Sequence, residues 1–236
     1  MQAITNITRS ESGFASGLRA GMSIAIGYMP VALTFGLLAR TTGLTVFEAI
    51  LMSMVVFAGA AQYITLSLLA IGTGAFEIIF TIFIVNIRHL LMSASINERV
   101  TEDTVWKKAL YAFGITDETF TVAATKTGSL TTSYMFGICL ISYASWVVFT
   151  GAGYMVGASL PSVIQQGMSV ALYAMFVGLL VPSSKKSKKV VVLAGVAAIF
   201  NSLFSYFHMS TGWSIVFATL LSSILVEVVI GRKENV

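Results

Sequence analysis

The chain has 236 residues, of which 56% are hydrophobic and only 10% are charged, and its formal net charge is +4. A soluble domain carries about 25% charged residues, so this composition excludes a soluble protein and predicts an integral membrane protein in a lipid bilayer. The basic residues are not interleaved with aromatic residues on a soluble face, so nucleic-acid binding is excluded as well.

Seven apolar segments follow one another along the chain, each near the ~20 residues needed to cross about 30 Å of hydrocarbon. Strands of a membrane barrel alternate apolar and polar residues over about ten positions, whereas these runs are continuous. The sequence therefore predicts an all-α, polytopic transmembrane helix bundle, a single integral membrane domain over residues 1–236. The predicted spans are 20–39, 47–71, 76–96, 131–157, 163–181, 190–207 and 212–230.

The first segment is expected to be a broken helix. Its centre reads IAIGYMPVA, and Pro30 removes a backbone donor and clashes with the preceding turn, so a break is predicted near Tyr28–Met29. Broken helices in transporters present their ends to substrate or ions. Gly27, Tyr28 and Pro30 are therefore candidate substrate-binding residues, and a simple packing kink is an equally weighted alternative.

The second segment contains FAGAAQY, residues 57–63. Its small residues leave space, and Gln62 brings both a hydrogen-bond donor and an acceptor. Gln62 is a candidate for binding a polar head group of a substrate. The commoner outcome for such a stretch is a tight helix crossing with one interhelical hydrogen bond.

The third segment carries three polar residues, Asn86, Arg88 and His89, in otherwise apolar surroundings. A guanidinium at membrane depth is costly, so it marks a functional site by default. On a regular helix Asn86 and His89 share one face and Arg88 points away from them. Arg88 is a candidate ligand for a carboxylate substrate, with Asn86 beside it. The alternative is a structural ion pair with Asp117, Glu118 or Glu48.

Residues 97–130 form a polar or amphipathic connection, and its part from 105 to 125 is a possible partly inserted helix. Within it, GITDETF has the pattern of a helix start, with Thr116 as a cap. Asp117 and Glu118 are candidate coupling residues together with His89, because a half-buried carboxylate readily binds protons. The two histidines and Cys139 are too few for an ordinary zinc site, so no metal, cofactor or catalytic residue is expected.

Clusters of Lys and Arg beside membrane helices mark the cytoplasmic side. The loop 182–189 holds four lysines and is predicted to be cytoplasmic, as is the C-terminal tail with Arg232 and Lys233. Counting back through seven spans places the N-terminus outside, although Arg9 and Arg19 precede the first span. Glycines that recur every four residues predict close helix packing; they are Gly13, Gly17, Gly21, Gly153 and Gly157.

Five stretches resemble one known family, the AzlC-type large subunit of branched-chain amino acid exporters. They are GFASGLRAGMSIAIGYMPVALTFGLLA (13–39), GLTVFEAILMSMVVFAGAAQY (43–63), VNIRHLLMSAS (85–95), GITDETF (114–120) and AMFVGLLVP (174–182). The resemblance implies export of leucine, isoleucine, valine or methionine across a prokaryotic cytoplasmic membrane, driven by an ion gradient. It also implies a separately encoded small membrane partner of the AzlD type.

The leading hypothesis is a secondary transporter that works by alternating access. A channel, or a non-transporting scaffold subunit of a membrane complex, is the alternative. An enzyme is not expected, since the chain has no G-x-S-x-G elbow and no H-E-x-x-H motif. The absence of a G-x-x-x-x-G-K-[ST] loop also argues against nucleotide hydrolysis by this chain.

Overall fold

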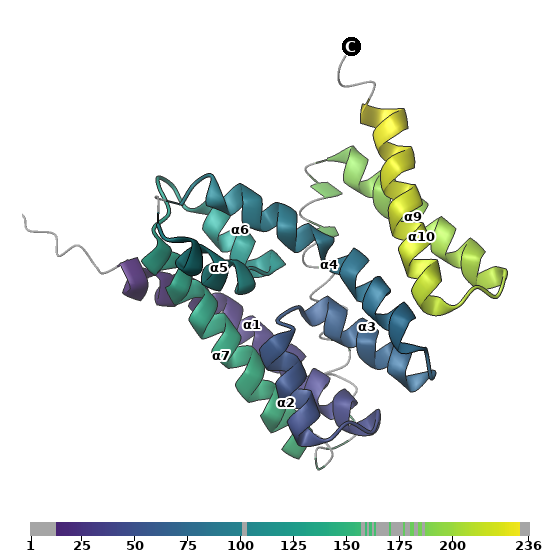
Figure 1. The fold of residues 1–236 in the computed structure, drawn as a ribbon, viewed down its shortest axis with the longest axis horizontal. Coiled ribbons are helices and arrows are strands. Elements are labelled where there is room, and N and C mark those ends of the chain that lie inside the picture. Colours follow the sequence, from purple (N-terminus) through teal and green to yellow (C-terminus); the bar gives the residue numbers. More distant parts are fainter. Residues whose placement is uncertain are drawn as a thin grey trace, which may run out of the picture.

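The computed structural model of the chain describes residues 13–100, 103–156 and 187–231, together with scattered positions between 159 and 185. This described part is helical and contains no strand, as the sequence predicts. The predicted span 163–181 and much of the lysine-rich loop lie outside the described residues. The helices (Figure 1) are α1 (Gly13–Thr41), α2 (Val46–Val55), α3 (Gly59–Ala70), α4 (Ala75–Asn97), α5 (Val105–Phe113), α6 (Asp117–Thr125), α7 (Thr132–Val156), α9 (Lys188–Tyr206) and α10 (Thr211–Val226), which continues into a π-helical turn (Glu227–Gly231).

Five of the described helices are long and apolar enough to cross a membrane: α1, α4, α7, α9 and α10. The polytopic helical architecture predicted from the sequence is therefore confirmed. These helices coincide with five of the predicted spans, apart from α1, which begins seven residues before its predicted start at 20.

Helices α1 and α7 run in the same direction with their backbones in contact. A Cβ added to Gly17 would overlap the carbonyl of Tyr134 in the first turn of α7. A Cβ added to Gly153, near the end of α7, would overlap the carbonyl of Leu33. The predicted packing role of these glycines is confirmed, and the pair forms the scaffold on which the other elements lie.

This packing leads to a first prediction. Gly153→Ala should lower the free energy of unfolding by about 1–3 kcal/mol, because the new methyl group can be accommodated only by separating two backbones. Gly27→Ala is the matched control, since a Cβ there meets nothing within 4 Å. Thermal unfolding in detergent compares the two variants, and equal unfolding temperatures would contradict the close approach.

Helix α1 continues through Pro30 without interruption, so the predicted break near Tyr28–Met29 is wrong. Proline leaves a carbonyl of the preceding turn without its usual partner. That carbonyl belongs to Ile26, and neighbouring helices hydrogen-bond other carbonyls close to it. Hydroxyl groups donate to carbonyls of α1 on both sides of the proline, Ser145 to Ala25 and Tyr63 to Val31, each at 2.7 Å.

The second predicted segment, 47–71, is not one span but two short helices, α2 and α3, with a break of three residues between them. The path of α2 follows α7 inward. The Tyr154 hydroxyl, in the last turns of α7, donates to the Leu44 carbonyl at 2.8 Å. The Tyr143 hydroxyl, near the middle of α7, donates to the Met54 carbonyl at 2.9 Å.

Helix α3 then returns toward the end where α2 began. Phe57, in the break, makes an edge-to-face ring contact with Tyr28. Tyr63, further along α3, bonds Val31, which lies closer to the C-terminal end of α1. The two helices therefore form a re-entrant hairpin, and the predicted crossing over 47–71 is wrong. Helices of 10 and 12 residues reach about 15 and 18 Å, roughly half a bilayer each.

A second hairpin, formed by α5 and α6, enters from the opposite end of the scaffold. Lys126, directly after α6, lies 4.2 Å from the ring centre of Tyr134 in the first turn of α7. Arg99, shortly before α5, donates to the Lys126 carbonyl at 2.6 Å, so the hairpin begins and ends at this level. Its tip reaches inward, where Thr116 lies 2.7 Å from the Tyr28 hydroxyl.

The helix α4 connects the two hairpins and runs opposite to α1 and α7 (Figure 1). It begins where the first hairpin ends and finishes where the second begins. The polar connection predicted over 97–130 therefore contains two helices, separated by Gly114–Thr116, in place of one amphipathic helix over 105–125.

The pair α9 and α10 packs beside α4. Glu77, in the first turn of α4, accepts hydrogen bonds from the Ser210 hydroxyl at 2.6 Å and from the Trp213 amide at 3.2 Å. The start of α10 therefore lies at the start of α4. At the other end of the pair, Lys189 forms an ion pair of 2.7 Å with Glu227.

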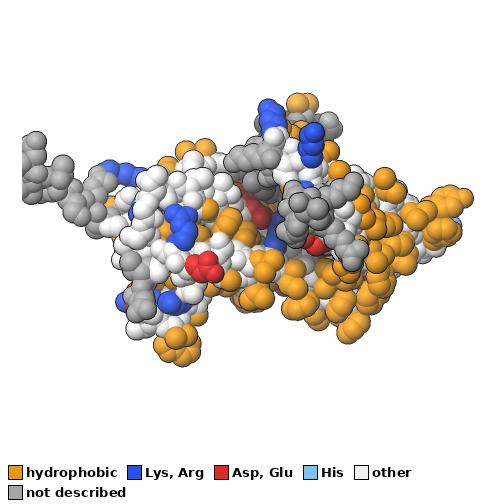
Figure 2. Space-filling view, turned by 90° about the horizontal axis from the view of Figure 1, so that it is seen from above, with side chains coloured by type: hydrophobic (Ala, Val, Ile, Leu, Met, Phe, Trp, Pro, Cys, Tyr) orange, Lys and Arg blue, Asp and Glu red, His pale blue; other side chains and the backbone are white. Residues whose placement is uncertain are grey.

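Basic residues gather at the end where α1 and α7 begin and α4 and α10 finish. Figure 2 shows Lys and Arg side chains on this end and a broad hydrophobic flank beside them. We refer to it as the basic end; its residues are Arg19, Arg99, Lys107, Lys108, Lys126, Lys188 and Lys189. Helix α1 therefore starts, and α10 finishes, at the same end of the described helices.

Candidate functional site

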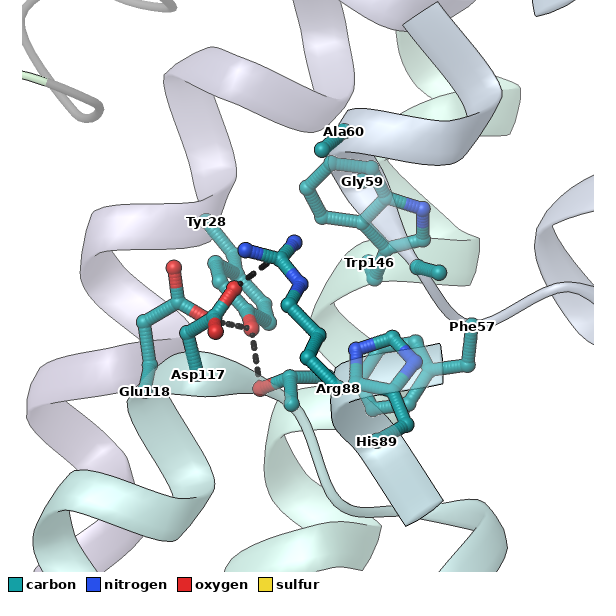
Figure 3. A pocket seen from close by; sticks show the side chains of 11 residues that line it. Tyr28, Phe57, Gly59, Ala60, Arg88, His89, Asp117, Glu118 and Trp146 are labelled. Atoms are coloured by element: carbon teal, nitrogen blue, oxygen red, sulfur yellow. Dashed lines mark hydrogen bonds and ion pairs between the residues drawn. The ribbon is translucent and has the colours of Figure 1, made fainter. Parts of the chain in front are cut away.

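A small, partly open pocket lies where the tips of the two hairpins meet, about halfway along α1, α4 and α7 (Figure 3). Its volume is about 20 Å³, room for a single water molecule. Its walls come from five separate parts of the chain. The lining residues are Tyr28, Phe57, Ala58, Gly59, Ala60, Arg88, His89, Thr116, Asp117, Glu118 and Trp146.

An ion pair crosses the pocket between α4 and α6. Arg88 Nη2 lies 2.9 Å from Asp117 Oδ2, and the two side chains are 41% and 27% exposed. The Arg88 guanidinium thus forms the ion pair with Asp117 that was one alternative in the sequence analysis, yet it remains accessible to other ligands. Arg88 Nε has no hydrogen-bond partner among the described residues. This Nε atom is buried, so a ligand would reach the guanidinium at its exposed Nη groups.

A second contact holds the α6 tip to α1. The buried Tyr28 hydroxyl donates to Glu118 Oε2 at 2.6 Å and lies 2.7 Å from Thr116 Oγ1. Thr116 is the cap of α6, as the sequence predicts, and its hydroxyl accepts from the Thr119 amide. Adjacent carboxylates on α6 thus have different partners, because successive helical residues point about 100° apart.

The start of α3 gives the opposite wall a different electrostatic character. Its cap residue, Ala58, offers no side-chain hydrogen bond, and the first turn has no acidic residue. The first amide groups of a helix carry a partial positive charge that favours anions. In Figure 3 the Arg88 guanidinium lies between Asp117 and the α3 residues Gly59 and Ala60. The pocket therefore has a positive wall at α3 and Arg88 and a negative wall at α6.

A buried polar network lies behind the pocket and includes Gln62, which is fully buried and does not line it. Trp146 Nε1 donates to Gln62 Oε1 at 2.7 Å, and Gln62 Nε2 donates to Ser53 Oγ at 3.2 Å. Ser53 Oγ lies 2.9 Å from Thr150 Oγ1. Gln62 therefore makes an interhelical hydrogen bond, which the sequence analysis gave as the commoner outcome for this stretch.

Several expected positions differ from the structure. Arg88 and His89 both line the pocket, so the expectation that they face opposite ways is wrong; neighbouring residues about 100° apart can flank one cavity. Asn86, Gly27 and Pro30 do not line it. Glu48 instead caps α2 by accepting from the Thr45 amide at 2.7 Å.

Sequence reasoning did not identify Trp146 and gave Phe57 no role of its own, although both line the pocket. Trp146 stands within the long apolar segment 131–157, where no charged residue or turn signal sets it apart. Phe57 opens the FAGAAQY stretch, and the cluster of small residues after it was the available signal for a break. Tyr28 was identified through its place before Pro30, and its hydroxyl is what reaches the site.

Comparisons with known proteins agree with this membrane architecture. The profile of the family described as AzlC protein matches residues 23–160, more than half of the chain. The inner membrane protein YgaZ of Escherichia coli is 30% identical over 191 residues, which cover 78% of each chain. An uncharacterized membrane protein of Archaeoglobus fulgidus is 32% identical over 189 residues, covering 79% of this chain and 83% of the relative.

A further relative has a name that states an activity. The branched-chain amino acid transport protein AzlC of Bacillus subtilis is 24% identical over 184 residues, covering 75% of this chain and 70% of that protein. No solved structure matches the chain. The profile match and the 30% identity to YgaZ show that the chain belongs to the AzlC family.

Proposed function

We propose that the chain is a secondary transporter that exports branched-chain amino acids across a prokaryotic cytoplasmic membrane. The observation that carries this proposal is the accessible Arg88–Asp117 ion pair in a pocket halfway along the membrane helices. Ionisable groups at that depth line substrate or ion pathways. The name of the Bacillus subtilis relative, a branched-chain amino acid transport protein, supports leucine, isoleucine and valine as the substrates. Methionine, which is similar in size and polarity, is a further candidate.

The two walls of the pocket suit the head group of an amino acid. A substrate carboxylate would bind Arg88 and the free amides at the start of α3. An ammonium group would bind Glu118, or Asp117 once its own ion pair is released. An apolar side chain would lie against Phe57, Ala60 and Trp146, which supply the hydrophobic part of the lining. No covalent chemistry is required.

The present pocket is closed, since about 20 Å³ is far smaller than a leucine. Transport therefore requires a hairpin tip to move, as alternating access demands. Coupling to an ion gradient is assigned to Asp117, Glu118 and His89, the titratable groups in the pocket besides Arg88 and Tyr28. A small membrane subunit of the AzlD type is the proposed partner.

The direct test is counterflow in liposomes that contain the purified chain with and without the small subunit. Labelled leucine, isoleucine, valine and methionine are compared with lysine and glutamate. We expect uptake of the four apolar amino acids against internal leucine, and no uptake of the charged ones. Steady ionic currents in a planar bilayer without counterflow would favour a channel. Full counterflow by the small subunit alone would make this chain a scaffold.

A further inference from the structure

We propose that the α5–α6 hairpin is the mobile gate of the pocket, that it opens toward the cytoplasm, and that the α2–α3 hairpin stays fixed to α7. The inference rests on the proposed function, because it takes the pocket as the place where substrate binds. It goes further by assigning different mechanical roles to two elements that have the same architecture.

The two hairpins belong to two copies of the same structural unit. Each unit has a long apolar helix followed by two short helices with a three-residue break, α1 with α2–α3 and α4 with α5–α6. The long helices run in opposite directions, and the hairpins enter from opposite ends (Figure 1). Inverted repeats of this kind place a transport site between equivalent elements that open to different sides.

The α2–α3 tip is held by neutral groups that a ligand cannot reach. Ser53 on α2 and Gln62 on α3 are both bonded to α7, through Thr150 and Trp146. All four side chains are at most 1% exposed. Opening this hairpin would leave buried donors and acceptors without partners, at a cost of about 1–3 kcal/mol for each group.

The charged contacts of the α5–α6 tip are made with groups that a substrate can replace. Asp117 bonds Arg88, and Glu118 bonds the Tyr28 hydroxyl. The contacts of this tip with α7 include the packing of Gly114 on Cys139 and a weak bond from the Cys139 thiol to the Tyr111 carbonyl at 3.7 Å. A substrate carboxylate can take the place of Asp117 on Arg88, and a substrate ammonium can compete for Glu118. Arrival of the substrate therefore weakens the contacts that join α6 to α4 and α1. Among the described contacts at the α2–α3 tip, none responds in this way.

The side on which this gate opens follows from charge. The α5–α6 hairpin enters from the basic end, and Lys and Arg gather on the cytoplasmic side of membrane proteins. Lys107, Lys108 and Lys126 lie on this hairpin or directly after it. The gate therefore opens to the cytoplasm, the side from which an exporter loads its substrate.

The test measures opening without relying on transport. Hydrogen–deuterium exchange of the purified chain reports on backbone amides of 117–125 and of 59–70. Asp117→Asn should raise exchange in 117–125 by roughly tenfold, corresponding to about 1.4 kcal/mol of lost closing energy, and should leave 59–70 unchanged. Asp103→Asn is the matched control: it makes the same chemical change on a carboxylate outside the pocket that is exposed to a similar degree, 19%, and bonds Lys107 just before α5.

Cysteine labelling adds the direction of opening. Ala60→Cys places a thiol in the pocket wall, on the hairpin that stays fixed. The natural Cys139 is kept because it is buried against the α5–α6 hairpin, and the chain without Ala60→Cys supplies the background labelling. A membrane-impermeant thiol reagent should modify it from the cytoplasmic side, faster with Asp117→Asn, and not from the outside. Labelling from the outside, or increased exchange in 59–70 in place of 117–125, would overturn the proposal.

Leucine separates the two proposals. If Asp117→Asn opens the hairpin but added leucine changes neither exchange nor labelling, the gate stands and the amino acid substrate is wrong. If Asp117→Asn leaves exchange in 117–125 at the level of Asp103→Asn, the gate is wrong whatever leucine does.

Discussion

Arg88→Ala is expected to reduce leucine counterflow on the order of 100-fold at normal protein abundance. The ion pair is partly exposed, so losing it alone costs less than the roughly 2–5 kcal/mol of a desolvated charge pair. The large effect is expected because the lost cation is also the proposed ligand of the substrate carboxylate. The variant leaves Asp117 in the pocket without its 2.9 Å partner. Initial rates at several leucine concentrations measure the loss as a change in kcat/KM.

Three further variants separate binding from folding. Arg88→Lys keeps the charge but loses the planar, two-pronged donor geometry, so it should restore abundance more than transport. Arg88→Ala combined with Asp117→Ala removes both charges, and should fold well yet remain inactive. Arg40→Ala is the control, since this exposed arginine lies in the last turn of α1, away from the pocket, and bonds the Tyr154 carbonyl. Normal counterflow in abundant Arg88→Ala protein would remove Arg88 from the substrate site.

The crossing helices were predictable because length and hydropathy suffice for them. Segment 76–96 differs from α4 by one residue at each end, and 131–157 differs likewise from α7. The prediction of one span over 47–71 was wrong because it relied on length and hydropathy alone. Its 25 apolar residues are long enough to span, and nothing in composition distinguishes one straight helix from two half-length helices that turn back. Tertiary contacts with α7, such as Tyr143 to Met54, decide the path.

The one break that the sequence predicts, in the first segment, is wrong, and the break in the second segment was not predicted. Pro30 was the stronger local signal, yet α1 continues through it, with hydroxyls from α7 and α3 bonding carbonyls on either side. The break in the second segment has no proline. There the chain turns at small residues beside Trp146, where Gly59 lies so close to the indole that a Cβ would approach it to 2.9 Å. Local sequence signals therefore predicted that one membrane segment would be interrupted, but they placed the interruption in the wrong segment.

The charged part of the site was predictable, since the cost of charge at membrane depth singles out Arg88, Asp117 and Glu118 from sequence alone. Their partners were not. Tyr28 is 90 residues away from Glu118 in the chain, and only the inward turn of α5–α6 brings them together. Trp146 carried no signal at all, and its role depends on the same inward turn of the other hairpin.

Gln62→Leu should lower the free energy of unfolding by about 2–4 kcal/mol, the second large effect expected. The substitution leaves the Trp146 indole N–H without an acceptor in a fully buried position, and an orphaned donor alone costs about 1–3 kcal/mol. It also removes the bond from α3 to Ser53 on α2, which closes the hairpin. Ser67→Ala is the control on the same helix, because its hydroxyl bonds only the Tyr63 carbonyl of the preceding turn.

A double-mutant cycle with Trp146→Phe distinguishes this explanation from simple loss of packing. Trp146→Phe removes the donor, so Gln62→Leu in that background should cost less than in the wild type, with a coupling of about 1 kcal/mol or more. Thermal unfolding in detergent, followed by intrinsic tryptophan fluorescence, supplies all four corners. Additive losses would mean that Gln62 stabilises α3 without holding Trp146. The α2–α3 hairpin would then lack the anchor that makes it the fixed wall of the pocket.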